Sequence, residues 1–558
     1  MPQIQAQQSP RVTHGEVFTR RWIVEAILDL VGYTPDRDLS SLRLIEPSCG
    51  TGAFITPVVD RLIESWSARH SDVGVLTHAI SAYDLLEHNV KHTRDLVVTR
   101  LIDAGIEPES SHRLATTWIQ RGDYLLDGPR ATLFDHADQD PSADFIVGNP
   151  PYIRLEDMPT KLSAAYRERW PTMSGRADVY IGFYERALRS LAPEGRLAFI
   201  CADRWMRNQY GGALRSLVAA EFSVDAVWTM HDVDAFETTV SAYPAITMIS
   251  RRRQGCAIVA DADSTFNAKS ASQLTRWIFD EDVESTTGPG FQAHRLPHWF
   301  AGDEMWPAGS PERIALVEYL NDNFEPLHDP RLGTRVSIGI ATGADSVYVT
   351  DDPEIVERDR LLPIAMAGDT KSGRFTWGEN YLVNPWEEDG TLVDLSRYPK
   401  LRSYFLLHRE KLTSRHIAKK NPRSWHKTID KVNHALTARP KILIQDMRNS
   451  INPVLDLGGH YPHHNLYYVV SDEWDIEVLG GLLLSRVAQA FIEAYSVRMR
   501  GNTLRFQAQY LKKIRVPHPD SISPETKDAL RCAFLDRDAE AATQAARVAY
   551  KIDSSVRL

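Results

Sequence analysis

Residues 42–54 read LRLIEPSCGTGAF, and this stretch decides the fold class. Leu42 to Ile45 form an apolar run with the length of a short buried strand. Two glycines, Gly50 and Gly52, follow it, and they let the backbone approach a ligand closely. Apolar residues then recur at helical spacing from Ile55 to Trp66. The stretch therefore predicts a strand, a ligand-binding turn and a helix.

The same alternation continues through the first half of the chain. Apolar runs predict strands at 144–147, 197–201 and 245–249, and a helical pattern covers 179–191. Strands separated by helices indicate an α/β domain with a mostly parallel sheet and helices on both faces.

Composition divides the chain into four parts. We predict a catalytic domain over 1–260 and, because Ser, Thr, Pro and Gly are frequent there, an irregular linker over 261–305. Residues 306–520 lack a strand–helix rhythm, which favours a mixed α+β domain. Residues 521–558 are rich in Ala and charged residues and predict a helical tail.

The bulk composition excludes several classes of protein. The 558 residues contain no apolar run of about 18 residues, so we expect no membrane span. The four cysteines are far apart and form no CxxC pair, which favours a reducing cytoplasm and predicts neither a zinc site nor any other metal. The net charge is −10, so a polyanion would have to bind where basic residues gather.

The strongest chemical signal is Asn149-Pro150-Pro151-Tyr152, directly after the predicted strand 144–147. Such a loop lies at the carboxyl edge of a parallel sheet, where ligands bind. Two prolines stiffen it and remove backbone donors. The side-chain oxygen of Asn149 and the backbone oxygen of Pro150 could then accept both hydrogens of an amino group, and Tyr152 adds an aromatic face.

The glycine turn favours a cofactor other than a dinucleotide. Position 55 is Ile, where the dinucleotide motif needs a third glycine. Glu46, just before the turn, could meet a cofactor that carries an amino group or a positive charge.

With these motifs in order, the sequence resembles the gamma-class, TaqI-like N6-adenine DNA methyltransferases of restriction-modification systems. The resemblance covers about the first 255 residues and extends more loosely to about Pro519. It implies an S-adenosylmethionine-dependent methyltransferase domain with a Rossmann-like sheet, followed by a mixed α+β target-recognition domain. It also implies a prokaryotic, cytoplasmic protein at the nucleoid.

The resemblance assigns the binding site for S-adenosylmethionine. Asp84 would bind the ribose hydroxyls and Asp123 would read the cofactor adenine. The full set of expected cofactor residues is Phe18, Thr19, Glu46, Pro47, Ser48, Cys49, Gly50, Gly52, Phe54, Asp84, Asp123, Tyr124 and Asn149.

The resemblance also assigns the catalytic residues Asn149, Pro150, Pro151, Tyr152 and Phe236. Phe236 would stack on the far side of a flipped base, and Tyr243 is a second candidate for that role. Flipping is required because N6 of adenine is paired and stacked inside a duplex. We expect direct displacement without a cysteine nucleophile, so that Cys49 only packs.

Recognition of the DNA sequence and binding of the DNA backbone are assigned to the second half of the chain. Residues 402–427 contain eight Lys or Arg and one acidic residue, Glu410, which suits phosphate contact but is also typical of a solvated helical face. Residues 339–345 and 498–506 also resemble the family. The expected DNA-binding residues are Arg415, Lys419, Lys420, Arg423, Lys427, Arg498 and Arg500.

Three alternatives remain open. The same loop could serve an N-methyltransferase that acts on RNA guanine or on a protein glutamine. The chain could also be a catalytically silent DNA-binding or scaffold subunit. A fused nuclease is the third; no convincing nuclease motif is visible, so we expect no cleavage. Double-stranded DNA and a separate cognate restriction endonuclease are the expected partners, and we expect a monomer without membrane attachment.

Overall fold

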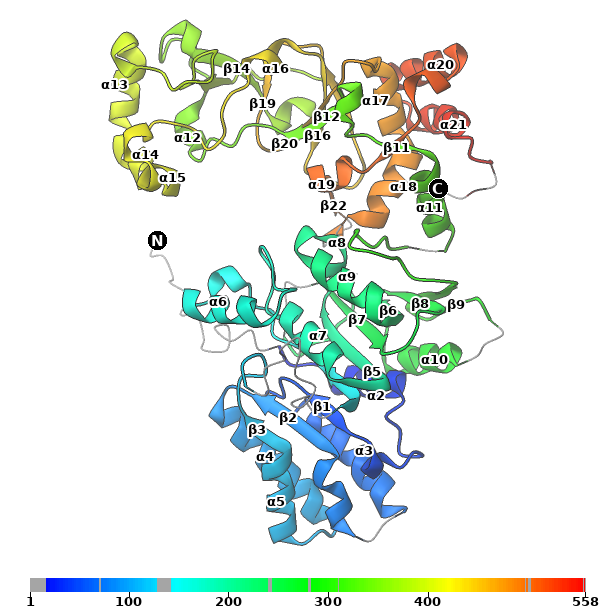
Figure 1. Cartoon of the computed structure of the whole chain (residues 1–558). Coiled ribbons are helices and arrows are strands. Elements are labelled where there is room, and N and C mark those ends of the chain that lie inside the picture. The colour runs from blue at the N-terminus through cyan, green and yellow to red at the C-terminus, as the bar shows by residue number, and fades with distance from the viewer. Residues whose placement is uncertain are drawn as a thin grey trace. The chain divides into compact units, whose positions relative to one another are not determined.

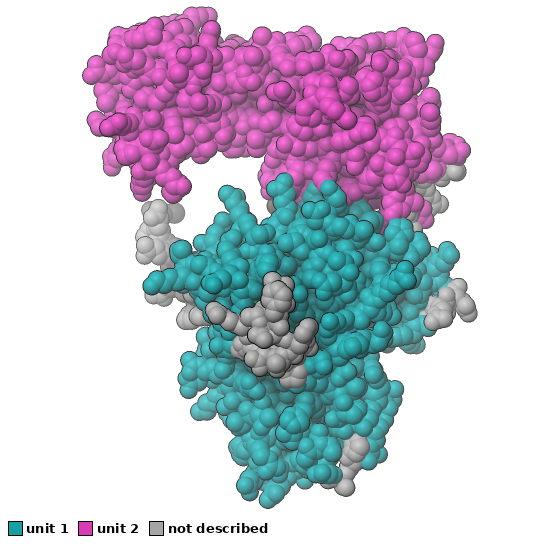
Figure 2. Space-filling view, viewed as in Figure 1, with its two compact units in different colours: residues 1–311 teal, residues 312–558 magenta. Residues whose placement is uncertain are grey.

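The computed structural model forms two compact units, Met1–Pro311 and Glu312–Leu558, which Figure 2 colours separately. The residues that it describes are 17–69, 72–127, 142–238, 243–279, 283–309, 311–496, 498–499, 503–554 and 556.

A ten-stranded sheet forms the centre of the first unit (Figure 1). Its strands are β1 (Leu44–Glu46), β2 (Ile80–Asp84), β3 (Ile119–Arg121), β4 (Ala143–Gly148), β5 (Leu191–Ala202), β6 (Ser223–Thr229), β7 (Pro244–Ser250), β8 (Ala257–Ala262), β9 (Ser285–Gly288) and β10 (Phe291–Leu296). Their order is β3-β2-β1-β4-β5-β7-β6-β8-β10-β9. The pairs among β1 to β5 are parallel, whereas β7 runs antiparallel to both of its neighbours. The predicted α/β domain with a mostly parallel sheet is confirmed.

Helices pack on both faces of this sheet. They are α2 (Arg21–Val31), α3 (Ile55–Ser67), α4 (Glu87–Asp103), α5 (Pro108–Trp118), α6 (Thr160–Arg169), α7 (Tyr180–Arg189), α8 (Arg204–Arg207), α9 (Gly212–Glu221) and α10 (Ala268–Ile278). Side chains alternate across a strand. In β5, Ala198 and Ile200 face the core shared with α2, α3 and α10, whereas Phe199 meets Tyr184 of α7, with ring centroids 5.1 Å apart.

The strand order brings two loops together. β1 pairs with β2 on one side and with β4 on the other, all parallel, so the chain reverses its direction across the sheet at β1 and β4. Loops that follow the carboxyl ends of strands at such a switch point border a common crevice. The glycine turn after β1 and the Asn149 loop after β4 are these two loops.

The predicted linker over 261–305 is wrong, because this segment extends the sheet. Asn267 caps α10 by accepting from the backbone N–H of Lys269 and Ser270, and β9 and β10 form an antiparallel hairpin that pairs with β8. Gly290, with a φ of 79°, lies in the hairpin turn. The Ser-, Thr- and Gly-rich composition that suggests a linker therefore belongs to a capped helix and an edge hairpin.

The described residues of the second unit form four small sheets, with orders β11-β23, β12-β20-β16-β18, β13-β15-β14-β19 and β17-β22-β21. Their strands are β11 (Glu325–Pro326), β12 (Arg335–Ile338), β13 (Val349–Thr350), β14 (Leu361–Ala365), β15 (Tyr381–Val383), β16 (Lys441–Gln445), β17 (Met447–Arg448), β18 (Val454–Asp456), β19 (Tyr461–Pro462), β20 (Leu466–Val470), β21 (Arg498–Met499), β22 (Thr503–Arg505) and β23 (Arg515–Val516). All pairs are antiparallel except β14 with β19.

The helices of the second unit are α11 (Pro311–Asn323), α12 (Asp345–Tyr348), α13 (Pro399–Leu407), α14 (Arg409–Ser414), α15 (His416–Lys420), α16 (His434–Ala438), α17 (Ile476–Leu484), α18 (Arg486–Tyr495), α19 (Ala508–Leu511), α20 (Pro524–Asp536) and α21 (Ala539–Tyr550). Within the described part of 521–558, α20 and α21 are helical, but they do not form a separate tail. Phe534 and Ala542 pack with Leu484 in a buried cluster, so α20 and α21 belong to the second unit.

Candidate active site

The glycine turn is tied to the end of β2. Gly50 and Gly52 have φ values of 50° and 88°, in the region that favours glycine. The backbone N–H of Gly50 donates to Asp84 Oδ2 across 2.9 Å, and the hydroxyl of Thr93 donates to the Gly50 oxygen across 2.9 Å. These bonds hold the turn open beside the Asp84 carboxylate.

Glu46 lies buried under this turn, with 1% of its surface exposed. Burial, reinforced by the negative charge of Asp84, raises the pKa of Glu46 well above its usual value. Its Oε2 atom has no hydrogen-bond partner among the described residues. An unpaired buried acceptor is costly, so Glu46 suits a ligand that brings a donor or a positive charge.

The Asn149 loop is oriented by a distant segment. Asn149 Nδ2 donates to the backbone oxygen of Val17 across 2.8 Å and to the hydroxyl of Thr19 across 3.2 Å. These partners assign the nitrogen to that side of the amide. Asn149 Oδ1 is buried and has no partner in the part of the chain that the structure describes. The amide therefore presents an acceptor that is already oriented.

The segment at Thr19 is itself fixed by the region of Phe236. Thr19 and Phe236 form an antiparallel bridge. The N–H of Arg20 donates to the oxygen of Ala235 across 3.0 Å, and the N–H of Glu237 donates to the oxygen of Phe18 across 2.9 Å. Three segments far apart in sequence thus meet at Asn149.

A cavity of about 440 Å³ joins the two loops. The expected site residues that line it are Phe18, Pro47, Ser48, Gly50, Asp84, Asp123, Tyr124, Asn149 and Pro151. Outside its lining lie Thr19, Glu46, Cys49, Gly52, Phe54, Pro150, Tyr152 and Phe236. Phe54 is 2% exposed and packs in the core, which its apolar ring favours over contact with a polar cofactor.

Other lining residues carry no sequence motif. Leu85, Met158, Leu162, Tyr166 and Phe183 supply apolar surface to the cavity. Leu85 is 52% exposed, unusual for a large aliphatic side chain, and it directly follows Asp84. Only the helical pattern over 179–191 signals any of these residues, and it predicts their burial rather than a binding role.

Asp123 is held at one side of the cavity. Its Oδ2 accepts from the hydroxyl of Tyr166 across 2.8 Å, and its Oδ1 accepts from the N–H of Leu125 across 2.9 Å. The neighbouring Tyr124 ring stacks on Phe183 with centroids 5.4 Å apart. Carboxylates at Asp84 and Asp123, with aromatic surface between them and the Asn149 loop, suit a ligand that is both polar and flat.

The aromatic pair expected to hold a base is close but not parallel. The rings of Tyr152 and Phe236 have centroids 6.4 Å apart and planes at 81°, and Phe236 is 5% exposed. Stacking on both faces of a base needs parallel rings. A base could enter between these two rings only after one of them turns. Tyr243, the second candidate, instead lies edge-on to His231, with centroids 5.2 Å apart.

Cys49 is 3% exposed, and burial raises its thiol pKa well above the usual value. A buried thiol with a raised pKa stays protonated and is a poor nucleophile. These properties support the expectation that Cys49 packs.

The basic residues of 402–427, in the second unit, differ in their surroundings. Arg415 donates to the backbone oxygens of Leu412, Thr342, Trp425 and Lys427 and to the Tyr348 hydroxyl, at 2.8–3.3 Å. Its guanidinium is already engaged by these backbone oxygens, so the prediction that Arg415 contacts DNA is not supported. Lys419, Lys420 and Arg423 are exposed and Lys427 is half-buried. The side chain of Arg498, and Arg500 altogether, lie outside the described residues.

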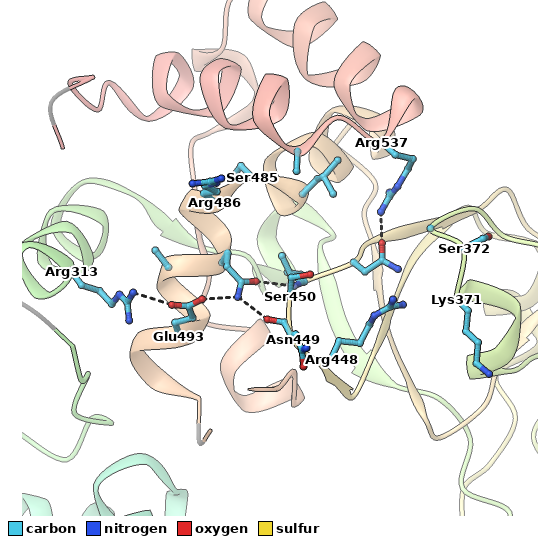
Figure 3. A pocket seen from close by; sticks show the side chains of 17 residues that line it. Arg313, Lys371, Ser372, Arg448, Asn449, Ser450, Ser485, Arg486, Glu493 and Arg537 are labelled. Carbon is cyan, nitrogen blue, oxygen red and sulfur yellow. Dashed lines mark hydrogen bonds and ion pairs between the residues drawn. The ribbon is translucent and has the colours of Figure 1, made fainter. Parts of the chain in front are cut away.

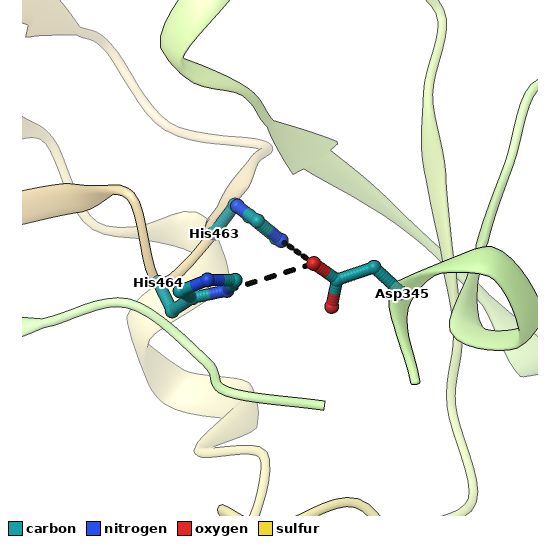
Figure 4. A group of neighbouring side chains, drawn as sticks. All are labelled: Asp345, His463 and His464. Atoms are coloured by element: carbon teal, nitrogen blue, oxygen red, sulfur yellow. Dashed lines mark hydrogen bonds and ion pairs between the residues drawn. The ribbon is translucent and has the colours of Figure 1, made fainter. Parts of the chain in front are cut away.

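Asp345, the last residue of the segment 339–345, faces His463 and His464 (Figure 4). His463 Nε2 lies 3.2 Å and His464 Nδ1 3.9 Å from Asp345 Oδ2. These three groups could approach a metal ion together. However, His463 Nδ1 has no described partner that would orient the ring as metal sites require, so the contacts indicate a tether between two loops.

Two family models match the chain. The model of the Eco57I restriction-modification methylase matches residues 84–236, and that of the TaqI-like C-terminal specificity domain matches residues 394–516. Type II methyltransferase M.XhoI from Xanthomonas vasicola is 40% identical over 561 residues, covering 97% of this chain and 98% of the relative. M.PaeR7I from Pseudomonas aeruginosa is 41% identical, covering 95% and 90%. The solved structure of the Type IIL enzyme MmeI in complex with DNA covers 96% of this chain and 74% of its own, with a TM-score of 0.61 and 13% identity.

The fold, the site and these matches define the class as restriction-modification DNA methyltransferases with a methylase part and a specificity domain. The chain belongs to the family of type II methyltransferases that includes M.XhoI and M.PaeR7I. These matches support DNA, rather than RNA or protein, as the substrate class. No helix within the described residues is both long and apolar enough to cross a membrane.

Proposed function

We propose that the protein transfers a methyl group from S-adenosylmethionine to the N6 amino group of an adenine flipped out of double-stranded DNA. The orientation of the Asn149 amide carries this proposal. Its nitrogen is taken by Val17 and Thr19, and its oxygen is left as a buried acceptor at a cavity shared with the glycine turn. An exocyclic amino group is the donor that such an acceptor would select.

The cavity residues fit S-adenosylmethionine. Asp84 suits its ribose hydroxyls and Asp123 its adenine, with Leu85 and Tyr124 as apolar cover. Glu46 lies just outside the lining, and its unpaired Oε2 suits the amino group of the cofactor. The donor supplies a methyl group that is already activated by a positively charged sulfur. The chain therefore has to bind and orient the two reactants and to exclude water. This is catalysis by positioning.

The loop residues would orient the target nitrogen. Asn149 Oδ1 and the backbone oxygen of Pro150 would each accept one N6 hydrogen, which directs the nitrogen lone pair away from the loop. Tyr152, whose hydroxyl donates to the oxygen of Ile200 across 3.2 Å, would present a ring edge or face to the base. Together with Pro151 and Phe236 these residues form the proposed catalytic set. Each base–aromatic contact contributes roughly 1–3 kcal/mol toward the cost of flipping.

The setting of the reaction follows from the family. We propose that the protein acts in the bacterial cytoplasm at the nucleoid, as the modification partner of a separate restriction endonuclease. Its expected state is a monomer.

The test is methyl transfer from tritiated S-adenosylmethionine to duplex DNA, followed by digestion to nucleosides. We expect the label in N6-methyladenine. The same assay on transfer RNA, ribosomal RNA and a release factor should give none. Label in methylcytosine, RNA or protein would contradict the proposal, and a size-exclusion measurement would check the monomer.

A further inference from the structure

A second cavity, of about 630 Å³, lies entirely within the second unit (Figure 3). Its wall is built from segments that are distant in sequence: Arg313 on α11, residues 371–373, residues 448–452, part of α18 and the turn before α21. None of these residues belongs to the methyltransferase site of the first unit. The cavity therefore needs a role of its own.

The lining is strongly basic although the whole chain carries a net charge of −10. It contains five cations, Arg313, Lys371, Arg448, Arg486 and Arg537, and one carboxylate, Glu493. Arg313 already lies 3.0 Å from Glu493, as the dashed line in Figure 3 shows. Arg486 faces Glu540 at 3.7 Å, with both side chains more than 60% exposed.

The other three cations have no carboxylate partner in the part of the chain that the structure describes. Lys371, Arg448 and Arg537 have no carboxylate within 4.0 Å among the residues that the structure describes. Arg448 is only half-buried and makes one long hydrogen bond, 3.4 Å, to Gln445 Oε1. Lys371 is an exposed lining residue.

Arg537 is held rigidly at the cavity. It donates to the backbone oxygen of Pro453 across 2.5 Å and to Asn452 Oδ1, and its guanidinium carbon lies 5.4 Å from the centre of the Phe534 ring. Burial, followed by the positive charges of Arg374 and Arg448, lowers the pKa of Arg537. Positive charges gathered around a half-buried guanidinium repel one another, which is unfavourable unless an anion offsets the repulsion.

The polar lining is also held in place. Gln489 accepts from the N–H of Ile451 across 2.8 Å and donates to Glu493 across 2.8 Å, which fastens the 448–452 loop to α18. Asn449 Oδ1 accepts from Thr503 across 3.3 Å, so its amide nitrogen stays available to donate. The cavity thus combines the amide donor of Asn449 with two guanidinium groups and an ammonium group.

We propose that this cavity binds a phosphate group through Lys371, Arg448 and Arg537, and that the phosphate belongs to the DNA backbone. Guanidinium forks match the geometry of phosphate oxygens, and Lys adds a point charge. In a DNA methyltransferase with a specificity domain, the DNA substrate itself supplies phosphate groups, in the phosphodiesters of its backbone. The inference rests on DNA binding and does not depend on which atom is methylated. A free nucleotide is the other source of the same chemistry.

The experiment compares the double variant Lys371→Gln/Arg448→Gln with Lys527→Gln/Lys551→Gln, a control that removes two charges elsewhere in the second unit. DNA affinity is measured by fluorescence anisotropy over a range of salt concentrations. The slope of log K against log salt is negative, and each phosphate group that the protein no longer binds lowers its magnitude by about 0.9. We expect the magnitude of the slope of the cavity variant to fall by about 0.9, as for one lost phosphate contact, equally for specific and unrelated duplexes, and the control to keep its slope.

Further measurements distinguish a DNA phosphate from a free phosphate, and loss of binding from misfolding of the variant. If the slope is unchanged but inorganic phosphate or adenosine monophosphate raises the Tm of the natural protein and not of the cavity variant, the phosphate is a free one. If neither changes, the proposal is overturned. The charge-preserving variant Lys371→Arg/Arg448→Lys should retain most of the slope, which excludes misfolding as the cause. At saturating DNA the cavity variant should still form the same methylated nucleoside. A different product would therefore count against the proposed methyl transfer and not against the phosphate site.

Discussion

Asn149 Nδ2 lies 2.8 Å from the backbone oxygen of Val17, a residue 132 positions earlier in the chain. This hydrogen bond determines which end of the amide faces outward. It makes the carboxamide of Asn149 an acceptor at the cavity before any substrate arrives. Preorganisation of this kind lowers the cost of orienting a reacting group.

Replacement of Asn149 by Ala should lower kcat by about 100-fold or more, the usual effect of removing a preorganised polar group at a reacting centre. Cofactor affinity, measured by calorimetry, should change little. Thr19→Val removes only the second, 3.2 Å partner of the amide and should cost about 1 kcal/mol, or roughly fivefold in kcat. Normal turnover in the Ala variant would remove Asn149 from the proposed mechanism.

Glu46→Gln should change how stability depends on pH. Because the folded pKa of Glu46 is raised, its contribution is fully present below the unfolded pKa and is lost as pH rises through the folded pKa. Without cofactor, the Gln variant should therefore gain in Tm over the natural protein as pH rises from about 5 to about 8. Its cofactor affinity should fall at the same time. A parallel Tm profile for the two proteins would contradict this assignment.

Arg415→Ala should act on folding rather than on DNA. The substitution removes the Arg415 donor from four backbone carbonyls and the Tyr348 hydroxyl, so we expect a decrease of about 2–4 kcal/mol in the free energy of unfolding. Urea denaturation would measure it. A stable variant with a reduced salt slope would instead restore Arg415 to the DNA-binding set.

The triple variant Lys419→Gln/Lys420→Gln/Arg423→Gln should have the opposite effect. These side chains are exposed and make no ion pair in the described part of the chain, so the free energy of unfolding should stay within about 0.5 kcal/mol. The salt slope of DNA binding should fall by up to about 0.9 for each phosphate group that these side chains neutralise in the natural protein. An unchanged slope would mean that the run is only a solvated face.

Thiol modification should spare the site. Cys49 and Cys201 are buried, and burial raises the thiol pKa of Cys201 to about 12. Cys256 and Cys532 are exposed. Iodoacetamide should alkylate the two exposed thiols, as seen by mass spectrometry, while methyl transfer stays unchanged. Rapid inactivation that follows labelling of Cys49 would contradict the assignment of a packing role.

Features set by neighbouring residues were predictable from sequence. The strand–turn–helix at 42–66 and the loop after 144–147 depend on apolar periodicity, glycine and proline, which act over a few positions. The same local patterns misassigned 261–305, because Ser, Thr and Gly are frequent in linkers and equally in an edge hairpin such as β9 and β10. They also could not distinguish Arg415 from Lys419, since both belong to one basic run.

The sequence by itself determined the class of fold, the family and the two loops that carry the proposed chemistry. Only the tertiary structure decided that Val17 and Thr19 hold the Asn149 amide, that Glu46 is buried without a partner for Oε2 among the described residues, and that Arg415 is consumed by carbonyls. The physical reason is the distance along the sequence over which each effect acts. Backbone preferences and apolar periodicity act between neighbours, whereas burial and hydrogen-bond partners arise only when packing brings distant segments together.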